Sequence, residues 1–158
     1  MTAVRIRRRE LFRGGAAGIV GMLAGCLGSD ADIDPDDPPE DQIETHLDDA
    51  NQYDGEILDE TGESTVTVEN GAVGTDYRFD PAAIRIDAGT TVVWEWLGTA
   101  PHTVTQLVIE EEAHGDGFDS GQKSGDGETW EFTFEESGVY LYVCEPHQDF
   151  QRGAVLVE

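Results

Sequence analysis

One cysteine and two histidines have the residue types and the spacing that metal chemistry requires. The segment CEPHQDFQRG begins at Cys144, directly after the apolar run GVYLYV, and places His147 three residues further on. His102 lies far upstream in APHTV, before a run of β-branched residues. A cysteine and a histidine at the tip of a strand could hold a metal, become oxidised or have no chemical role. The choice depends on the compartment in which the chain is found.

The first 25 residues have the composition of an export signal. Five arginines and one glutamate precede or border an apolar run at residues 14–24, which is too short to span a bilayer. The sequence RRELF at residues 8–12 approximates the twin-arginine type of signal. The alternative is a simple amphipathic tail.

The sequence LAGC at residues 23–26 has the form of a lipobox, in which the precursor is cut before the cysteine and the thiol carries the lipid. It predicts lipidation of Cys26 and attachment to a membrane surface, for which two acyl chains are needed because one binds only marginally. An unmodified or disulfide-bonded Cys26 is the alternative. The chain has two cysteines, so lipidation leaves Cys144 without an intrachain partner. An exported lone thiol is a liability unless something, such as a metal, occupies it.

The charge of the chain indicates the solvent in which it works. Removing residues 1–25 takes away five of nine basic and one of 34 acidic residues, which leaves four against 33 and a formal charge of −29. Such repulsion weakens a compact state, but at about 1 M salt the Debye length is only ~3 Å. The acidic excess is spread over every segment, which favours a halophilic protein over an acidic protein from ordinary salt. Nucleic acid is excluded as a partner because there is no basic patch.

Composition separates a polar segment from a β-rich one in the mature chain. Residues 29–42, SDADIDPDDPPEDQ, have few apolar residues and many prolines and aspartates, which is typical of a disordered acidic tether. A short helix is expected around residues 43–53, where His46 is interpreted as solvated. The expected organisation is an export signal at 1–25, a lipid-anchored tether at 26–53 and a folded domain at 54–158.

Short runs of branched and aromatic residues, punctuated by glycine, fill residues 54–158. In TTVVWEWL, Val92, Trp94 and Trp96 fall on one face of a strand, as a period of two requires. About eight such runs joined by turns predict an all-β fold, a β-sandwich of two sheets. The runs cover residues 64–70, 76–79, 83–87, 90–97, 102–109, 129–134, 138–144 and 153–158.

Blocks within residues 51–158 resemble the cupredoxins, the blue copper proteins, and most closely the halocyanins of salt-loving archaea. These blocks are YDG, FDPAAIRIDAGTTVVWEW, PHTV, FDSG, SGVYLYVCEPH and GAVLV. The resemblance implies a Greek-key β-sandwich with one type 1 copper near one end, held by His102, Cys144 and His147. Two imidazoles and a thiolate suit both oxidation states, because sulfur favours Cu(I), nitrogen accepts Cu(II) and a weak axial group tunes the potential.

The axial position departs from the pattern of these relatives. The loop after Cys144 contains no methionine, since Met1 and Met22 both lie in the signal region. Gln151, two residues before Gly153, occupies the corresponding place, and FQRG looks like FMRG of amicyanin. Stellacyanin-like proteins use an axial glutamine, so we expect the Gln151 amide oxygen as the axial ligand, with a lower potential than a thioether would give. The alternative is that Gln151 points to solvent.

The resemblance implies an electron carrier that is not an enzyme. It would be a monomer on the outer face of the cell membrane, passing single electrons between redox proteins of a respiratory chain. The alternative is a copper-binding or copper-delivery module without electron cycling. A catalytic copper enzyme is disfavoured because Val143 and Glu145, instead of histidines, flank Cys144. The partly exposed ring of His147 is the expected route for the electron. An apolar patch is expected around it, formed by Leu97, Pro101, Pro146 and Phe150.

Overall fold

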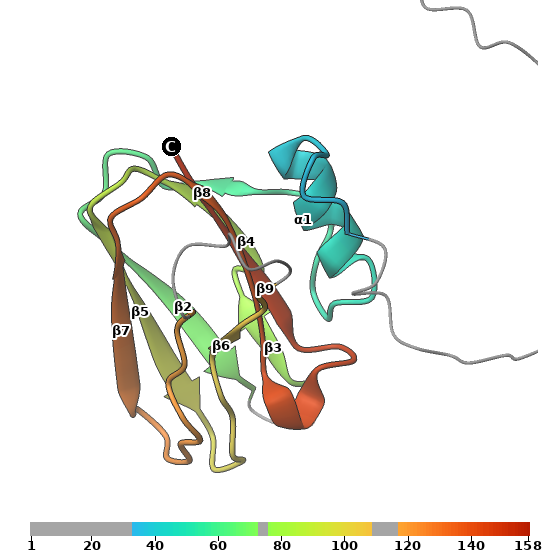
Figure 1. The fold of residues 1–158 in the computed structure, drawn as a ribbon. Helices are drawn as coiled ribbons and strands as arrows, with labels where there is room; N and C mark the ends of the chain where they lie inside the picture. Colours follow the sequence, from blue (N-terminus) through green and yellow to red (C-terminus); the bar gives the residue numbers. More distant parts are fainter. Residues whose placement is uncertain (1–32, 73–75, 109–116) are drawn as a thin grey trace, which may run out of the picture.

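Two β-sheets face each other, and a helix lies against the outer side of one of them (Figure 1). The computed structural model describes residues 33–72, 76–108 and 117–158. The five-stranded sheet has the order β1 (Leu58–Asp59), β4 (Ala83–Ile86), β9 (Arg152–Val157), β8 (Gly138–Val143) and β6 (Thr105–Gln106). The four-stranded sheet has the order β3 (Arg78–Asp80), β2 (Thr65–Gly71), β5 (Thr90–Leu97) and β7 (Thr129–Phe134). The prediction of an all-β sandwich is confirmed.

The core between the sheets is formed by alternate residues of each strand. Val92, Trp94 and Trp96 on β5 are all fully buried, as their spacing predicts. The ring of Trp94 meets Tyr142 of the opposite sheet edge to face, with ring centroids 5.5 Å apart. Such aromatic pairs contribute about 0.5–1.5 kcal/mol beyond the area that they bury. This core fixes the two sheets relative to each other.

Strand pairing brings two distant connections to one end of the sandwich. Antiparallel pairing of β8 with β9 aligns Val143 with Arg152, so residues 144–151 form a single short loop that includes the 3₁₀ turn η2 (Glu145–His147). β5 ends at Leu97, and the chain then crosses to β6 in the other sheet. The expected strand at 102–109 is limited to Thr105–Gln106 in the described residues, because His102 forms only an isolated bridge with Lys123.

The outer face of the five-stranded sheet is covered by the N-terminal segment, which differs from the expected domain boundary. Helix α1 (Pro39–Leu47) buries Ile43 and Leu47 completely, and both pack with Leu141 and Leu156 of the sheet. Ile33 is also buried in this cluster. Residues four apart on a helix share a face, so the acidic segment has an apolar stripe. Residues 33–53 therefore belong to the folded unit and are not a tether.

The prediction of a solvated His46 is wrong. His46 lies on the same face of α1 as Ile43 and is only 1% exposed. Its Nε2 atom is 3.1 Å from the carbonyl oxygen of Tyr142 on β8. Its own carbonyl oxygen accepts a hydrogen bond of 3.3 Å from the guanidinium of Arg152 on β9. The helix is thereby fixed to both strands that border the 144–151 loop.

The N-terminal export signal and Cys26 lie outside the described residues, so they stay predictions. Over the residues that are described, no helix has the length and apolar character needed to cross a membrane.

Replacing Ile43 with alanine tests whether the helix is part of the domain. Ile43 is fully buried, so Ile43→Ala should lower the free energy of unfolding by about 2–5 kcal/mol, as for other buried aliphatic side chains. Its neighbour Glu44 is exposed, and Glu44→Ala should change stability by no more than about 0.5 kcal/mol. Denaturant unfolding of both variants in the same concentrated salt measures the difference. Equal stability of Ile43→Ala and the wild type would show that α1 is not docked.

Candidate metal centre

The three predicted ligands occupy backbone positions at one end of the sandwich. Cys144 follows β8 directly and precedes η2, at whose end His147 lies. His102 lies between β5 and β6 and is held by two backbone hydrogen bonds with Lys123, of 2.9 and 3.0 Å. The His102 ring is backed by Gly71, where a Cβ would lie 2.7 Å from the Leu97 carbonyl oxygen and 3.0 Å from His102 Nε2.

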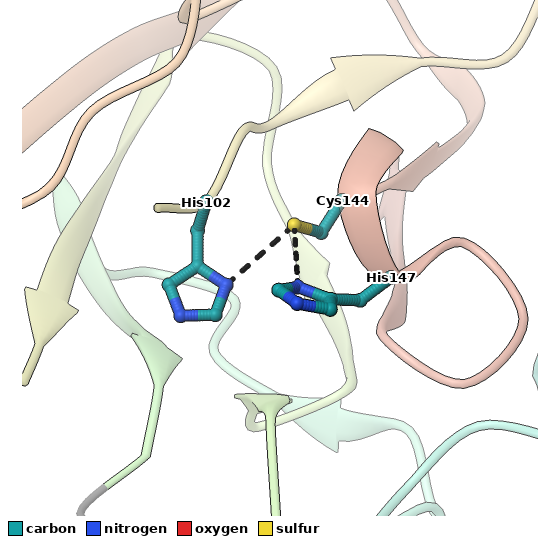
Figure 2. Close-up of side chains that lie close together, drawn as sticks. All are labelled: His102, Cys144 and His147. Atoms are coloured by element: carbon teal, nitrogen blue, oxygen red, sulfur yellow. Dashed lines mark hydrogen bonds between the residues drawn. The ribbon is translucent and has the colours of Figure 1, made fainter. Parts of the chain in front are cut away.

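The three side chains point toward one another (Figure 2). The Sγ atom of Cys144 is 3.6 Å from Nδ1 of His102 and 3.5 Å from Nδ1 of His147. The ligand atoms of these residues all lie within 4.8 Å of one another. One sulfur and two imidazole nitrogens in this arrangement suit copper, because sulfur favours Cu(I) and the nitrogens accept Cu(II). The structure thus brings together all three residues that the sequence singles out.

Backbone hydrogen bonds fix this geometry without a metal. The N–H of Thr103 donates to Cys144 Sγ at 3.4 Å, and the N–H of Glu145 donates to Thr103 Oγ1 at 2.9 Å. The N–H of Cys144 donates to the carbonyl oxygen of Gln151 at 3.0 Å. The first two bonds join the His102 segment to the Cys144 loop, and the third closes the loop. Ligands held in this way are preorganised for a metal.

Burial sets the protonation of the metal-free ligands. Cys144 and His102 are completely buried, whereas His147 is half-buried. Burial raises the pKa of the Cys144 thiol. Burial, together with the nearby His147 ring, holds the pKa of His102 below its ordinary value. At neutral pH the metal-free site therefore contains a neutral thiol and a neutral His102 imidazole, and metal binding must displace a proton from the sulfur.

Gln151 is buried beside the ligands, which differs from the alternative in which it points to solvent. Its side chain is 0% exposed, and its Oε1 atom lies 2.9 Å from Nδ1 of His102. Its Nε2 atom donates to Asn70 Oδ1 at 2.8 Å and to the Arg78 carbonyl oxygen at 3.2 Å. Because an amide oxygen only accepts, His102 donates from Nδ1 in the metal-free protein. The amide oxygen is thus directed at a ligand atom.

Two further residues at the site are not among those predicted. The ring of Tyr77 lies 4.8 Å from that of His102 and 4.5 Å from that of His147, centroid to centroid. Its contacts come from tertiary packing, for which the sequence holds no signal. Asn70 does leave a signal, because it continues the inward-facing series of Val66 and Val68 on β2 with a polar side chain.

Of the four residues expected to form an apolar patch around His147, Phe150 has a ring contact with it. Pro101 and Pro146 are exposed, and Leu97 is half-buried. Phe150 is half-buried as well, with its ring centroid 5.8 Å from that of His147.

Comparisons with known proteins agree with the donor set. A family model described as copper binding proteins of the plastocyanin/azurin family matches residues 66–158. A halocyanin from Natronomonas pharaonis is 42% identical over 162 residues, which cover 96% of this chain and 97% of the relative. A plastocyanin from Scenedesmus fuscus is 32% identical over 59% of this chain and 99% of its own length. The solved structure of oxidised plastocyanin from Dryopteris crassirhizoma has the same fold, with a TM-score of 0.52 and 22% identity over 59% of this chain and all of its own.

The protonated thiol predicts that copper affinity depends on pH. The pKa of Cys144 is raised, so below that pKa each bound copper displaces one proton from sulfur, and the apparent affinity should increase by about tenfold per pH unit. Competition with a Cu(I) chelator across the neutral range measures this slope. In Cys144→Ser the thiol-dependent slope should disappear. A wild-type affinity that stays constant with pH would contradict a neutral thiol in the metal-free site.

Proposed function

Because this chain belongs to the plastocyanin/azurin family of copper-binding proteins, we propose that it carries single electrons between redox proteins at the outer face of the cell membrane. The ligands proposed for its one copper ion are His102, Cys144 and His147. The observation that carries this proposal is the convergence of their three ligand atoms within 4.8 Å. Copper, when bound, supplies the Cu(II)/Cu(I) couple.

The chain supplies a largely buried and preformed pocket for that couple. Cys144 and His102 are buried, and Thr103 and Glu145 hold the two ligand segments together by hydrogen bonds. A pocket that is fixed beforehand needs little movement when an electron arrives or leaves. A delivery module would instead have to open its site to release copper, so the closed arrangement favours electron transfer.

The route for the electron is proposed to be the ring of His147. It is the only one of the three proposed ligands that is not fully buried. The rings of Tyr77 and Phe150 both contact the ring of His147, with centroid distances of 4.5 and 5.8 Å. A redox partner that docks on this end approaches the ligand itself without displacing the buried residues.

Gln151 is proposed as the axial ligand. Its oxygen already faces His102 Nδ1 at 2.9 Å, and its side chain is buried. An amide oxygen is a harder donor than a thioether and stabilises Cu(II) relative to Cu(I). The reduction potential is therefore expected to be lower than with methionine at this position.

Attachment through a lipidated Cys26 is proposed for the location. The export signal and the lipobox support it, as does the similarity to a halocyanin over nearly the whole chain. Because the folded unit includes Ile33, only seven residue steps separate it from Cys26, a reach of at most about 25 Å. The domain would then stay close to the membrane surface, where respiratory redox proteins are exposed.

A visible spectrum of the copper-loaded protein tests the central function. Charge transfer from the Cys144 thiolate should give an intense blue absorption that a mild reductant bleaches and an oxidant restores. Cys144→Ser should lose this absorption and tight copper binding while remaining folded. A colour retained by Cys144→Ser would overturn the ligand assignment. Copper binding without reversible bleaching would favour the delivery module.

Membrane attachment is tested with a cysteine that lies outside the copper domain. Cys26→Ser should move the protein from the membrane fraction to the soluble fraction of expressing cells and leave the copper spectrum unchanged. The spectrum serves as the internal control for folding. Membrane retention of the variant would contradict a lipid anchor at Cys26.

A further inference from the structure

Strand β2 directs one polar side chain inward, after two valines on the same face. Val66, Val68 and Asn70 alternate on its inner face, and Asn70 is 0% exposed. A buried amide is unfavourable unless its hydrogen bonds are made. An apolar residue at this position would continue the pattern without that cost. The burial of a polar side chain at this position therefore needs an explanation other than packing.

The hydrogen bonds of Asn70 supply that reason. Its Oδ1 atom accepts from Nε2 of Gln151 at 2.8 Å, while the carbonyl oxygen of Arg78 accepts from the same nitrogen at 3.2 Å. A primary amide nitrogen carries two hydrogens, and these two acceptors use both of them. The nitrogen of Gln151 is therefore held on the side of β2 and β3, and its oxygen is left facing His102 Nδ1 at 2.9 Å.

The reversed orientation of the Gln151 amide is unfavourable at this place. Turning it over would set Oε1 against the carbonyl oxygen of Arg78, which can only accept. Among the described residues, Nδ2 of Asn70 is buried without a hydrogen-bond partner. Asn70 thus presents its oxygen to Gln151 even though its own nitrogen is left unsatisfied. Asn70 therefore satisfies the amide nitrogen of Gln151 while one of its own hydrogen-bonding groups stays unsatisfied.

We propose that Asn70 is a positioning residue which, together with the Arg78 carbonyl, holds the side-chain oxygen of Gln151 toward His102, Cys144 and His147. This inference rests on the proposed copper site and deepens it. In the metal-free protein the oxygen accepts the Nδ1 proton of His102. If His102 binds copper through Nδ1, its neutral ring would carry its proton on Nε2 instead, by exchange with solvent, and the same oxygen would remain beside the ligand atoms as a free donor. Asn70 would thereby set the reduction potential without touching the metal.

A double-mutant cycle separates positioning from a general effect of polarity. Asn70→Leu releases the Gln151 amide and weakens its oxygen as a donor. The one-electron equilibrium constant should then shift at least tenfold toward Cu(I), which raises the reduction potential by at least 59 mV. In the Gln151→Met background there is no amide to orient, so the same Asn70→Leu change should have little effect. Voltammetry of all four proteins in one concentrated salt measures the cycle. Equal shifts in both backgrounds would overturn the positioning role.

The metal-free protein gives a second readout that does not depend on copper. Long-range proton–nitrogen NMR reports which imidazole nitrogen of His102 carries its proton. The wild type should show the proton on Nδ1, and Asn70→Leu should show a mixture of tautomers. Asn70→Asp, which keeps the acceptor, should retain the wild-type tautomer and serves if the leucine variant does not fold. An unchanged tautomer in folded Asn70→Leu would mean that the Arg78 carbonyl alone orients Gln151, and the proposal would be wrong.

A matched control removes a buried hydroxyl far from the ligands. Thr90 on β5 is 3% exposed and donates to the Glu63 carbonyl oxygen at 2.9 Å. Thr90→Val should leave both the potential and the His102 tautomer unchanged; a shift equal to that of Asn70→Leu would contradict a specific role for Asn70.

Failure of the copper proposal would look different, because the wild type would then lack a blue spectrum while the tautomer result would still stand. A potential unaffected by Gln151→Met would refute axial coordination alone.

Discussion

The hydrogen bonds of Thr103 with Cys144 and Glu145 are the contact on which the metal centre depends. His102 and Cys144 are 42 positions apart in the chain. Cys144 follows β8, and His102 lies in the connection from β5 to β6, the strand that pairs with β8. Thr103 joins their segments twice, through its N–H to Sγ and through its hydroxyl to the N–H of Glu145. The pairing of β6 with β8 ends at Thr105 and Val143, and these two hydrogen bonds hold the segments together beyond it, where the ligands lie.

The N-terminal segment supports the same loop from the other side. The backbone N–H of Asn51 donates to the carbonyl oxygen of Phe150 at 2.7 Å. The side-chain amide of Asn51 donates to the carbonyl oxygen of Tyr77 at 2.9 Å. The guanidinium of Arg152 donates to the carbonyl oxygens of Gln148 and His46. Residues that would otherwise serve only as a spacer therefore brace the loop that carries Cys144 and His147. This gives a physical reason for the apolar stripe of α1 in a strongly acidic segment.

The sequence was sufficient for some of these features because they depend on local spacing. The alternation of Val92, Trp94 and Trp96 predicts the core face of β5, and the interval between Cys144 and His147 predicts that they share a loop. The start of helix α1 is obscured because aspartates and prolines dominate residues 29–42, although Ile43 and Leu47 keep a helical interval.

The remaining features depend on contacts between distant segments. The burial of His46 follows from where α1 docks, and the contact of Tyr77 with both histidines follows from the position of β3. Asn70 could be noticed as a polar residue on an inward face, but its partner Gln151 is 81 positions away in the chain. No local pattern connects the two.

The central claim is that the chain holds its copper ligands, including the orientation of Gln151, before the metal arrives. Crystal structures of the metal-free and copper-loaded forms in the same crystal lattice test it most directly. We expect the ligand atoms of His102, Cys144 and His147 to differ by no more than about 0.5 Å between the forms, with the Gln151 oxygen directed at the metal. A rearranged 144–151 loop in the metal-free form, or an amide turned away from the copper, would contradict it.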